Sequence, residues 1–330
     1  MAGSKSGIVR FGKPVMDALA LGLFGRRPET PAQRDVELIE RLRDRFREIM
    51  RNHASETSPA AQRWADNVRR LAACVRDRDP RAFLRWPVVQ ETMFAGTGRT
   101  AWTEWNALRK HPDWSGRWSQ AIVETPLGRP LPFLPYPRSS GNLIHHAYHL
   151  MQFEECAGTH LHEFDAVFEF GGGYGAMCRL WHNLGFEGRY TIFDLPAFSA
   201  LQEYYLSGVG LGANGAEDAD GRIRCLSQLE EFHRVVGHSA GGRGLRAMFL
   251  ATWSFSEAPL PIRDAIIPLL SECEAFLIAY QARFGEVDNV EYFTTFRNRF
   301  PYMEWKNWEI RHMPGNYYLM GSRSRGPGQV

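Results

Sequence analysis

The spacing of hydrophobic and polar positions changes near residue 139. Before that point, apolar residues recur every three or four positions, which is typical of amphipathic helices. Helices are predicted near residues 32–49, near 60–76 after the Ser58-Pro59 start signal, and near 81–94. The arginines between the apolar positions of the first helix are expected to form its solvated face. The chain therefore begins with a helical region.

Prolines crowd the segment 126–137, after a stretch that holds four tryptophans. Proline fixes φ and lacks the backbone N–H, so we expect no regular structure there. The segment is interpreted as a linker or as a wall packed against the next domain. The tryptophans are Trp102, Trp105, Trp114 and Trp118.

After a predicted helix over 142–156, short β-branched or aromatic runs alternate with helical patterns. Such alternation is typical of crossover connections in a mainly parallel sheet. The last two runs, across Met313-Pro314-Gly315, indicate an antiparallel hairpin. We predict an α/β fold with a helical region over 1–138 and a nucleotide-binding domain over 139–330. The expected strands are 166–170, 190–193, 222–225, 247–251, 275–280, 303–310 and 316–321.

Composition narrows the class of protein. The 330 residues are 44% hydrophobic, which excludes a disordered chain, and 39 Lys+Arg against 37 Asp+Glu leave a net charge of only +2. The net charge is too small to create an electrostatic field that attracts nucleic acid or an anionic membrane. No apolar run is long enough to span a bilayer. We therefore expect neither a nucleic-acid partner nor a membrane.

The N-terminus and the cysteines indicate a cytoplasmic protein. Basic residues precede an apolar stretch at 15–24, but Asp17 interrupts it and Arg26-Arg27 follow at once, so we expect no export signal. The five cysteines are scattered, odd in number and form no CxxC, so reduced thiols are expected rather than disulfides or a metal cage.

The most informative segment joins the runs 166–170 and 190–193. The first run holds Glu169, then Gly171, Gly173 and Gly175 allow a tight turn, and a helix follows; the second run ends in Asp194. Glycine permits positive φ and lets a ligand approach the backbone, while the helix N-terminus offers free N–H groups. A carboxylate at the tip of the second strand can accept hydrogen bonds from ribose hydroxyls.

Two nucleotide-type ligands fit this segment. Gly171-x-Gly173-x-x-Ala176 matches the dinucleotide fingerprint of NAD(P)-dependent oxidoreductases. Glu169-x-Gly171-x-Gly173-x-Gly175 matches the pattern Glu/Asp-x-Gly-x-Gly-x-Gly that binds S-adenosylmethionine. That ligand carries an ammonium and no pyrophosphate, so a carboxylate just before the glycines suits it better.

From about residue 142 to 322 the chain resembles class I S-adenosylmethionine-dependent methyltransferases, and more narrowly the sugar O-methyltransferase family. The residues that carry this resemblance are Phe168-Glu-Phe-Gly-Gly-Gly-Tyr-Gly175, Tyr190-Thr-Ile-Phe-Asp-Leu-Pro196, Gln202-x-x-Tyr205-Leu206, Trp253-Ser-Phe-Ser-Glu257 and Asn316-Tyr-Tyr-Leu319.

The resemblance implies a Rossmann-like, seven-stranded methyltransferase sheet whose last strand is antiparallel. It also implies a role for each motif residue. The glycines would cradle the methionine part of the cofactor with Glu169 in support, and Asp194 would hold the ribose. Leu195 would lie under the adenine, with Ser227 and Gln228 at its edge, and Trp253 and Ser254 would face the methyl donor.

Transfer of a methyl group to a hydroxyl calls for precise positioning and a general base. Candidate bases are His145 and His146 on the 142–156 helix, with Glu257 as an alternative base or as the group that orients the imidazole. Asp288 is a substrate-side candidate by position, and His312 on the hairpin is expected at the surface. No H-E-x-x-H pattern is present, so no metal is expected.

The sequence thus predicts an S-adenosylmethionine-dependent O-methyltransferase of natural product biosynthesis. Its acceptor would be a sugar or another hydroxylated small molecule, and its N-terminal helices would cover the acceptor, form a homodimer interface, or both. Two alternatives stay open: an NAD(P)-dependent Rossmann oxidoreductase, and a non-catalytic S-adenosylmethionine-binding subunit.

Overall fold

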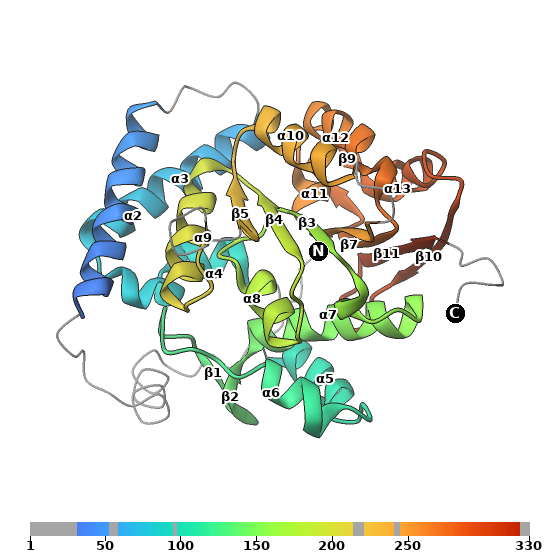
Figure 1. Cartoon of the computed structure of the whole chain (residues 1–330), viewed down its shortest axis with the longest axis horizontal. Coiled ribbons are helices and arrows are strands. Elements are labelled where there is room, and N and C mark those ends of the chain that lie inside the picture. The colour runs from blue at the N-terminus through green and yellow to red at the C-terminus, as the bar shows by residue number, and fades with distance from the viewer. Residues whose placement is uncertain (1–31, 53–58, 95–97, 214–220, 241–244, 324–330) are drawn as a thin grey trace, which may run out of the picture.

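A seven-stranded sheet forms the centre of the protein in the computed structural model, which describes residues 32–52, 59–94, 98–213, 221–240 and 245–323. The strand order is β10-β11-β7-β6-β3-β4-β5 (Figure 1). The strands are β3 (Ala166–Phe170), β4 (Arg189–Phe193), β5 (Ile223–Leu226), β6 (Ala247–Thr252), β7 (Ala275–Gln281), β10 (Met303–Glu309) and β11 (Asn316–Arg323).

Strand directions confirm the predicted Rossmann-like sheet. Strands β5, β4, β3, β6 and β7 pair in parallel, whereas β11 runs antiparallel to both β7 and β10. All five residues of β3 are buried, which explains why its sequence is continuously apolar apart from Glu169. The predicted hairpin is the β10–β11 pair.

Helices cover both faces of the sheet, and alternate strand residues divide between two hydrophobic clusters. Val167 and Met248 pack into the cluster that holds α7 (Gly141–Ala157), α8 (Ala176–Asn183) and α9 (Pro196–Gly208). Phe168 and Phe249 point to the other face and join the opposite cluster. The elements on that face are α10 (Leu229–Ala240), α11 (Ser254–Glu257), α12 (Leu260–Ile266), η4 (Ile267–Glu272) and α13 (Asn289–Arg297).

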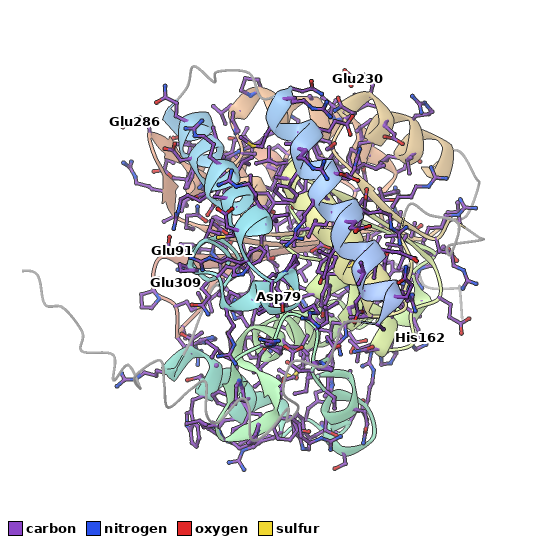
Figure 2. The ribbon with its side chains drawn as sticks, turned by 90° about the vertical axis from the view of Figure 1, so that its left-hand side faces the viewer. Asp79, Glu91, His162, Glu230, Glu286 and Glu309 are labelled. Carbon is purple, nitrogen blue, oxygen red and sulfur yellow. The ribbon has the colours of Figure 1, made fainter. Side chains whose placement is uncertain are left out.

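The N-terminal region packs on the first of these faces. Helix α2 (Gln33–Arg51) buries Leu38, Leu42 and Phe46 in the same cluster as α9. Most of its arginines are exposed, as predicted, but Arg43 is half-buried and donates to the carbonyls of Val75 and Arg78. Figure 2 shows α2 and α3 lying across this side of the molecule. The remaining elements of the region are α3 (Pro59–Asp77), η1 (Pro80–Arg85), α4 (Pro87–Met93), α5 (Arg99–Leu108), η2 (Trp114–Trp118) and α6 (Ser119–Ala121).

Two sequence-based expectations about this region are corrected. The helix predicted over 81–94 is divided into η1 and α4, because Pro87 disfavours a helical conformation at Trp86 and starts a new helix. The proline-rich segment does contain regular structure: β1 (Pro132–Phe133) pairs with β2 (Tyr136–Ser140). Proline is tolerated there because the pair is short, two-stranded and irregular in register.

Three short elements complete the described chain: η3 (Leu161–Glu163), β8 (Arg283–Phe284) and β9 (Val287–Asp288). All five cysteines are free thiols. Across the described ranges, no helix combines the length and apolarity that crossing a membrane would require. The apolar stretch 15–24 lies outside those ranges.

Candidate cofactor and acceptor site

The turn between β3 and α8 owes its shape to three glycines in the left-handed region. Gly171, Gly173 and Gly175 have φ values of 74°, 58° and 92°. The nearest atoms to a Cβ added at Gly173 belong to the Met93 side chain, at 3.7–3.9 Å, which is ordinary van der Waals contact. The next residues begin α8, whose N-terminal N–H groups favour electron-rich ligand atoms.

Gly171 serves a different purpose, which is close packing against the start of α11, the helix that follows β6. A Cβ there would lie 2.2 Å from Cβ of Ser254. The Ser254 hydroxyl donates to the carbonyl of Phe170. Ser254, which was expected to face the methyl donor, therefore lies against the glycine turn itself.

Glu169 lies beneath the turn. Its side chain is buried, it accepts a 3.0 Å hydrogen bond from the Tyr190 hydroxyl, and a Cβ at Gly172 would lie 3.1 Å from its Oε2. Burial raises the pKa of Glu169 to about 8, so the carboxyl is largely protonated near neutral pH. Glu169 supports the turn, and its repulsion of a pyrophosphate is weaker than the sequence suggests.

Asp194 ties the tip of β4 to the glycine turn. Its Oδ2 accepts from the Gly173 N–H at 3.2 Å and from Nε2 of Gln202 at 2.9 Å, while Oδ1 accepts from the Leu195 N–H. Burial raises the pKa of Asp194 to about 7. Leu195 beside it is 40% exposed and offers an apolar surface. Sequence reasoning quoted Gln202 in a motif but did not assign it to the site.

The loop after β5 lies at the same edge of the sheet. The Asp194 N–H donates to the carbonyl of Leu226 at 2.9 Å, which brings the following Ser227 and Gln228 close to Asp194. Ser227 is half-buried and Gln228 is exposed. The structure therefore brings the expected ribose and adenine residues together.

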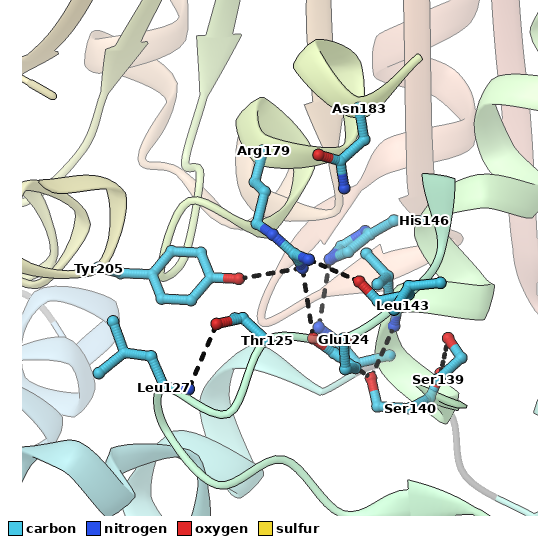
Figure 3. Close-up of polar contacts among 12 residues, drawn as sticks. Glu124, Thr125, Leu127, Ser139, Ser140, Leu143, His146, Arg179, Asn183 and Tyr205 are labelled. Atoms are coloured by element: carbon cyan, nitrogen blue, oxygen red, sulfur yellow. Dashed lines mark hydrogen bonds and ion pairs between the residues drawn. The ribbon is translucent and has the colours of Figure 1, made fainter. Parts of the chain in front are cut away.

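A buried polar network fixes α7 relative to α8 (Figure 3). Ser140 caps α7 by accepting from the Leu143 N–H, and its hydroxyl donates to Oε1 of Glu124 at 2.5 Å. Arg179 of α8 lies 3.4 Å from Oε2 of Glu124 and donates to the Tyr205 hydroxyl. The helix that carries the histidines is thereby held against the helix that follows the glycine turn.

A buried carboxylate joins two histidines from distant parts of the chain. Oε1 of Glu104, on α5, lies 2.7 Å from Nδ1 of His145 and 2.8 Å from Nε2 of His312. Burial alone would raise the pKa of Glu104, but the two imidazoles lower it below its usual value. The expectation that His312 lies at the surface is wrong, since its side chain is only 13% exposed and packs against Tyr148. Sequence reasoning gave no role to Glu104.

Trp253 connects this cluster to the sheet. It follows β6 with φ of 65°, a strained conformation for a bulky residue, and its indole N–H donates to Oδ1 of Asn316 at 2.7 Å. Its ring stacks on His145, with centroids 5.3 Å apart. The ring centroids of His149 and His145 lie 4.1 Å apart, and Nδ1 of His149 is hydrogen-bonded to the Tyr318 hydroxyl. Burial lowers the pKa of His149 well below 6.5, so this ring is neutral.

Several polar atoms of the cluster are buried without a hydrogen-bond partner. These atoms are Oε2 of Glu104, Nε2 of His145 and Nε2 of His149. Such an atom costs about 1–3 kcal/mol when it stays unpaired, so the cluster is suited to receive a polar group. Because the Glu104 carboxylate can only accept, Nδ1 of His145 donates to it, and in the neutral ring Nε2 carries a free lone pair.

The other candidates lie elsewhere. Glu257 of α11 accepts from Nε2 of Gln281 at 3.3 Å, and Asp288 caps α13 by accepting from the N–H groups of Val290 and Glu291. A cap role explains the Asp288 carboxylate without a substrate. Within the described part of the chain, no three His, Cys, Asp or Glu side chains are grouped as metal ligands would be.

Comparisons with known proteins give only distant likenesses. No protein-family model and no curated protein matches the sequence. The mitomycin 7-O-methyltransferase MmcR is 11% identical over 94% of this chain and 98% of its own, with a TM-score of 0.37. A Podospora anserina methyltransferase solved with SAH is 8% identical over 82% and 100%, with a TM-score of 0.35. A precorrin-6y C5,15-methyltransferase of Geobacter metallireducens is 12% identical over 55% and 87%, with a TM-score of 0.33. These likenesses are too weak to carry an assignment.

Proposed function

We propose that the protein is an S-adenosylmethionine-dependent O-methyltransferase that acts on a hydroxyl group of a small molecule. The observation that carries this proposal is the adjacency of the glycine turn and the histidine cluster. Ser254 packs against Gly171, and the preceding residue, Trp253, stacks on His145. A cofactor on the turn and a base on α7 therefore border the same short segment after β6.

The cofactor fits the residues present. The left-handed turn at Gly173 lets the methionine part approach the backbone, the Asp194 carboxylate accepts from the ribose hydroxyls, and the exposed Leu195 side chain packs on the adenine. When bound, S-adenosylmethionine supplies an electrophilic methyl group on a sulfonium, whose sulfur keeps the S–C electron pair as the new O–C bond forms. A neutral Glu169 beneath the turn supports the backbone without adding charge.

His145 is the general base of this proposal. Its Nε2 lone pair takes the hydroxyl proton as the oxygen attacks, and Glu104 holds the required tautomer and stabilises the imidazolium that forms. The stacked Trp253 ring keeps the imidazole in place. A positioned base of this kind contributes about a hundredfold to ten-thousandfold in rate.

Two observations support the proposed acceptor class: the unpartnered polar atoms of the histidine cluster, and the resemblance of the sequence to sugar O-methyltransferases. The buried, unpartnered atoms around His145 suit a hydroxylated metabolite such as a sugar or a sugar-containing natural product. Because Glu104 comes from α5, the N-terminal region completes the acceptor side instead of serving only as a separate module.

One pair of measurements tests the proposal. Calorimetry should show binding of S-adenosylmethionine and of its demethylated product, and weaker or no binding of nicotinamide dinucleotides. Labelled S-adenosylmethionine should then transfer its methyl group to members of a panel of sugars and glycosides. Tighter binding of a nicotinamide dinucleotide would favour the oxidoreductase. Cofactor binding with no transfer across the panel would favour a non-catalytic binding subunit.

A further inference from the structure

Asn142, in the first turn of α7, touches both halves of the site. Only 2% of this residue is exposed, and its Nδ2 lies 3.2 Å from the Tyr174 hydroxyl and 3.3 Å from Nε2 of His146. An amide nitrogen has two hydrogens to donate and accepts none. Both contacts are therefore donations from Asn142, and Nε2 of His146 must be the accepting nitrogen.

That contact determines where the proton of His146 lies. Burial lowers the pKa of His146 to about 3, with His145 adding to this effect and Glu104 opposing it, so the ring is neutral. With Nε2 accepting, the single ring proton is on Nδ1. Nδ1 is itself buried without a partner, and so is Oδ1 of Asn142. The pair thus presents one unused donor and one unused acceptor.

We propose that Asn142 is a positioning residue that holds His146 as the Nδ1–H tautomer, so that His146 donates to a second hydroxyl of the methyl acceptor. This inference rests on the proposed function and deepens it. His146 then binds substrate and is not a base, and His145 acts alone. Nδ1 points away from the Nε2–Asn142 contact, so one hydroxyl of the acceptor accepts from Nδ1 of His146 and a separate hydroxyl donates to Oδ1 of Asn142. The acceptor class is accordingly a polyhydroxylated molecule.

The second contact of Asn142 reaches the cofactor turn. Tyr174 stands between Gly173 and Gly175, and burial raises its pKa well above 10, so its hydroxyl stays protonated. Its ring packs against Phe83 and Phe94 of the N-terminal region. One amide group therefore orients a residue of the cofactor turn and a residue of the acceptor side.

Nitrogen-15 NMR of the full-length protein labelled at histidine tests the tautomer without requiring activity. The wild-type His146 should show a protonated Nδ1 and a bare Nε2, unchanged across the neutral pH range. In Asn142→Asp the carboxylate can only accept, so the proton should move to Nε2 and the pKa of His146 should rise. The exposed Asn298→Asp, which makes the same chemical change, should leave the His146 signals as they are.

A wild-type His146 protonated at Nε2 would overturn the inference, even if the Asn142 variant failed to fold. An unchanged His146 signal in folded Asn142→Asp would do the same. Either result would leave the proposed function standing. If His146 carries its proton on Nδ1 but no methyl transfer occurs, that result would count against the proposed function and not against the tautomer.

Kinetics with an acceptor found in the methyl-transfer panel separates the two histidines. His146→Phe removes the donor and should raise KM about tenfold with a smaller change in kcat. His145→Gln keeps a polar group near Nε2 but removes the base, so it should lower kcat by about a hundredfold or more. An equal loss of kcat in both variants would contradict the assigned roles.

Discussion

The carboxylate of Glu104 lies 2.7 Å from Nδ1 of His145, although 41 residues separate them along the chain. Glu104 belongs to α5 of the N-terminal region and is fully buried, whereas His145 belongs to α7, which precedes β3. A buried carboxylate next to an imidazole fixes the tautomer of the ring and stabilises its protonated form. The N-terminal helices therefore contribute directly to the candidate chemistry.

Glu104→Gln should leave cofactor affinity unchanged and lower kcat by about a hundredfold or more, because a neutral amide stabilises the imidazolium poorly. Single-turnover methyl transfer and calorimetry measure the two effects. Glu91→Gln, on the exposed side of α4 and paired with Arg70, is the matched control and should keep full activity. A Glu104→Gln enzyme with wild-type kcat would exclude the His145–Glu104 pair from catalysis.

Gly173→Val should abolish cofactor binding, because a branched side chain would stand where the cofactor must approach the backbone and would disfavour the φ of 58°. Gly185→Val provides the control, since Gly185 also has positive φ, at 90°, but nothing lies within 4 Å of an added Cβ. Both variants should lose stability through backbone strain, and only Gly173→Val should lose binding by calorimetry. Equal affinity in the two variants would remove the turn from the cofactor site.

The strands and the glycine turn could be predicted because their signals are local. The central parallel strands β3, β6 and β7 are short, mainly apolar runs buried on both faces, and the three glycines at alternate positions all adopt positive φ. The acidic ends of β3 and β4 could likewise be identified. The buried position of Glu169 under Gly172 could not be predicted, because it depends on how the strands and the turn pack together.

The histidine cluster could be predicted only in part. His145 stood out because histidines gather on one helix, but its partner Glu104 comes from a helix with no catalytic pattern. His312 lies 208 residues from Glu104 in the sequence, and its place on a hairpin suggested the surface. Contacts between residues so far apart in the sequence depend on how α5, α7 and the turn between β10 and β11 pack together. Residue spacing in a single sequence does not reveal that packing.

Cofactor binding should depend on pH through Asp194. Burial raises the pKa of Asp194 to about 7, and ribose hydroxyls donate best to the charged carboxylate, so affinity should rise as pH rises through about 7. Asp194→Asn should bind weakly at every pH and lose this dependence. Calorimetry across the neutral range checks the prediction, with the exposed Asp44→Asn as control. A pH-independent wild-type affinity would contradict it.

The same group should make the free protein less stable at higher pH. A folded pKa above the unfolded value of 3.8 stabilises the fold fully below that value, and the contribution is lost as pH rises through about 7. Asp194→Asn cannot ionise, so the Tm of the wild type should fall relative to that of Asp194→Asn as pH rises from about 4 to above 7, whatever the fixed cost of the hydrogen bonds that Asn cannot accept. A Tm difference between the two proteins that does not change with pH would contradict the prediction.

Trp253→Phe tests whether the strained residue after β6 holds the base in place. The phenyl ring can still stack on His145, but the indole N–H that anchors the side chain to Asn316 is lost. We expect kcat to fall about tenfold, because loss of one buried hydrogen bond weakens the placement of the imidazole, while cofactor affinity stays the same.

Trp305→Phe makes the same change in the other hydrophobic cluster, where the indole donates to the carbonyl of Phe300. It should lower thermal stability by a similar amount and leave kcat intact. If both variants lose kcat equally, the effect reports general destabilisation, and Trp253 has no particular role in positioning His145.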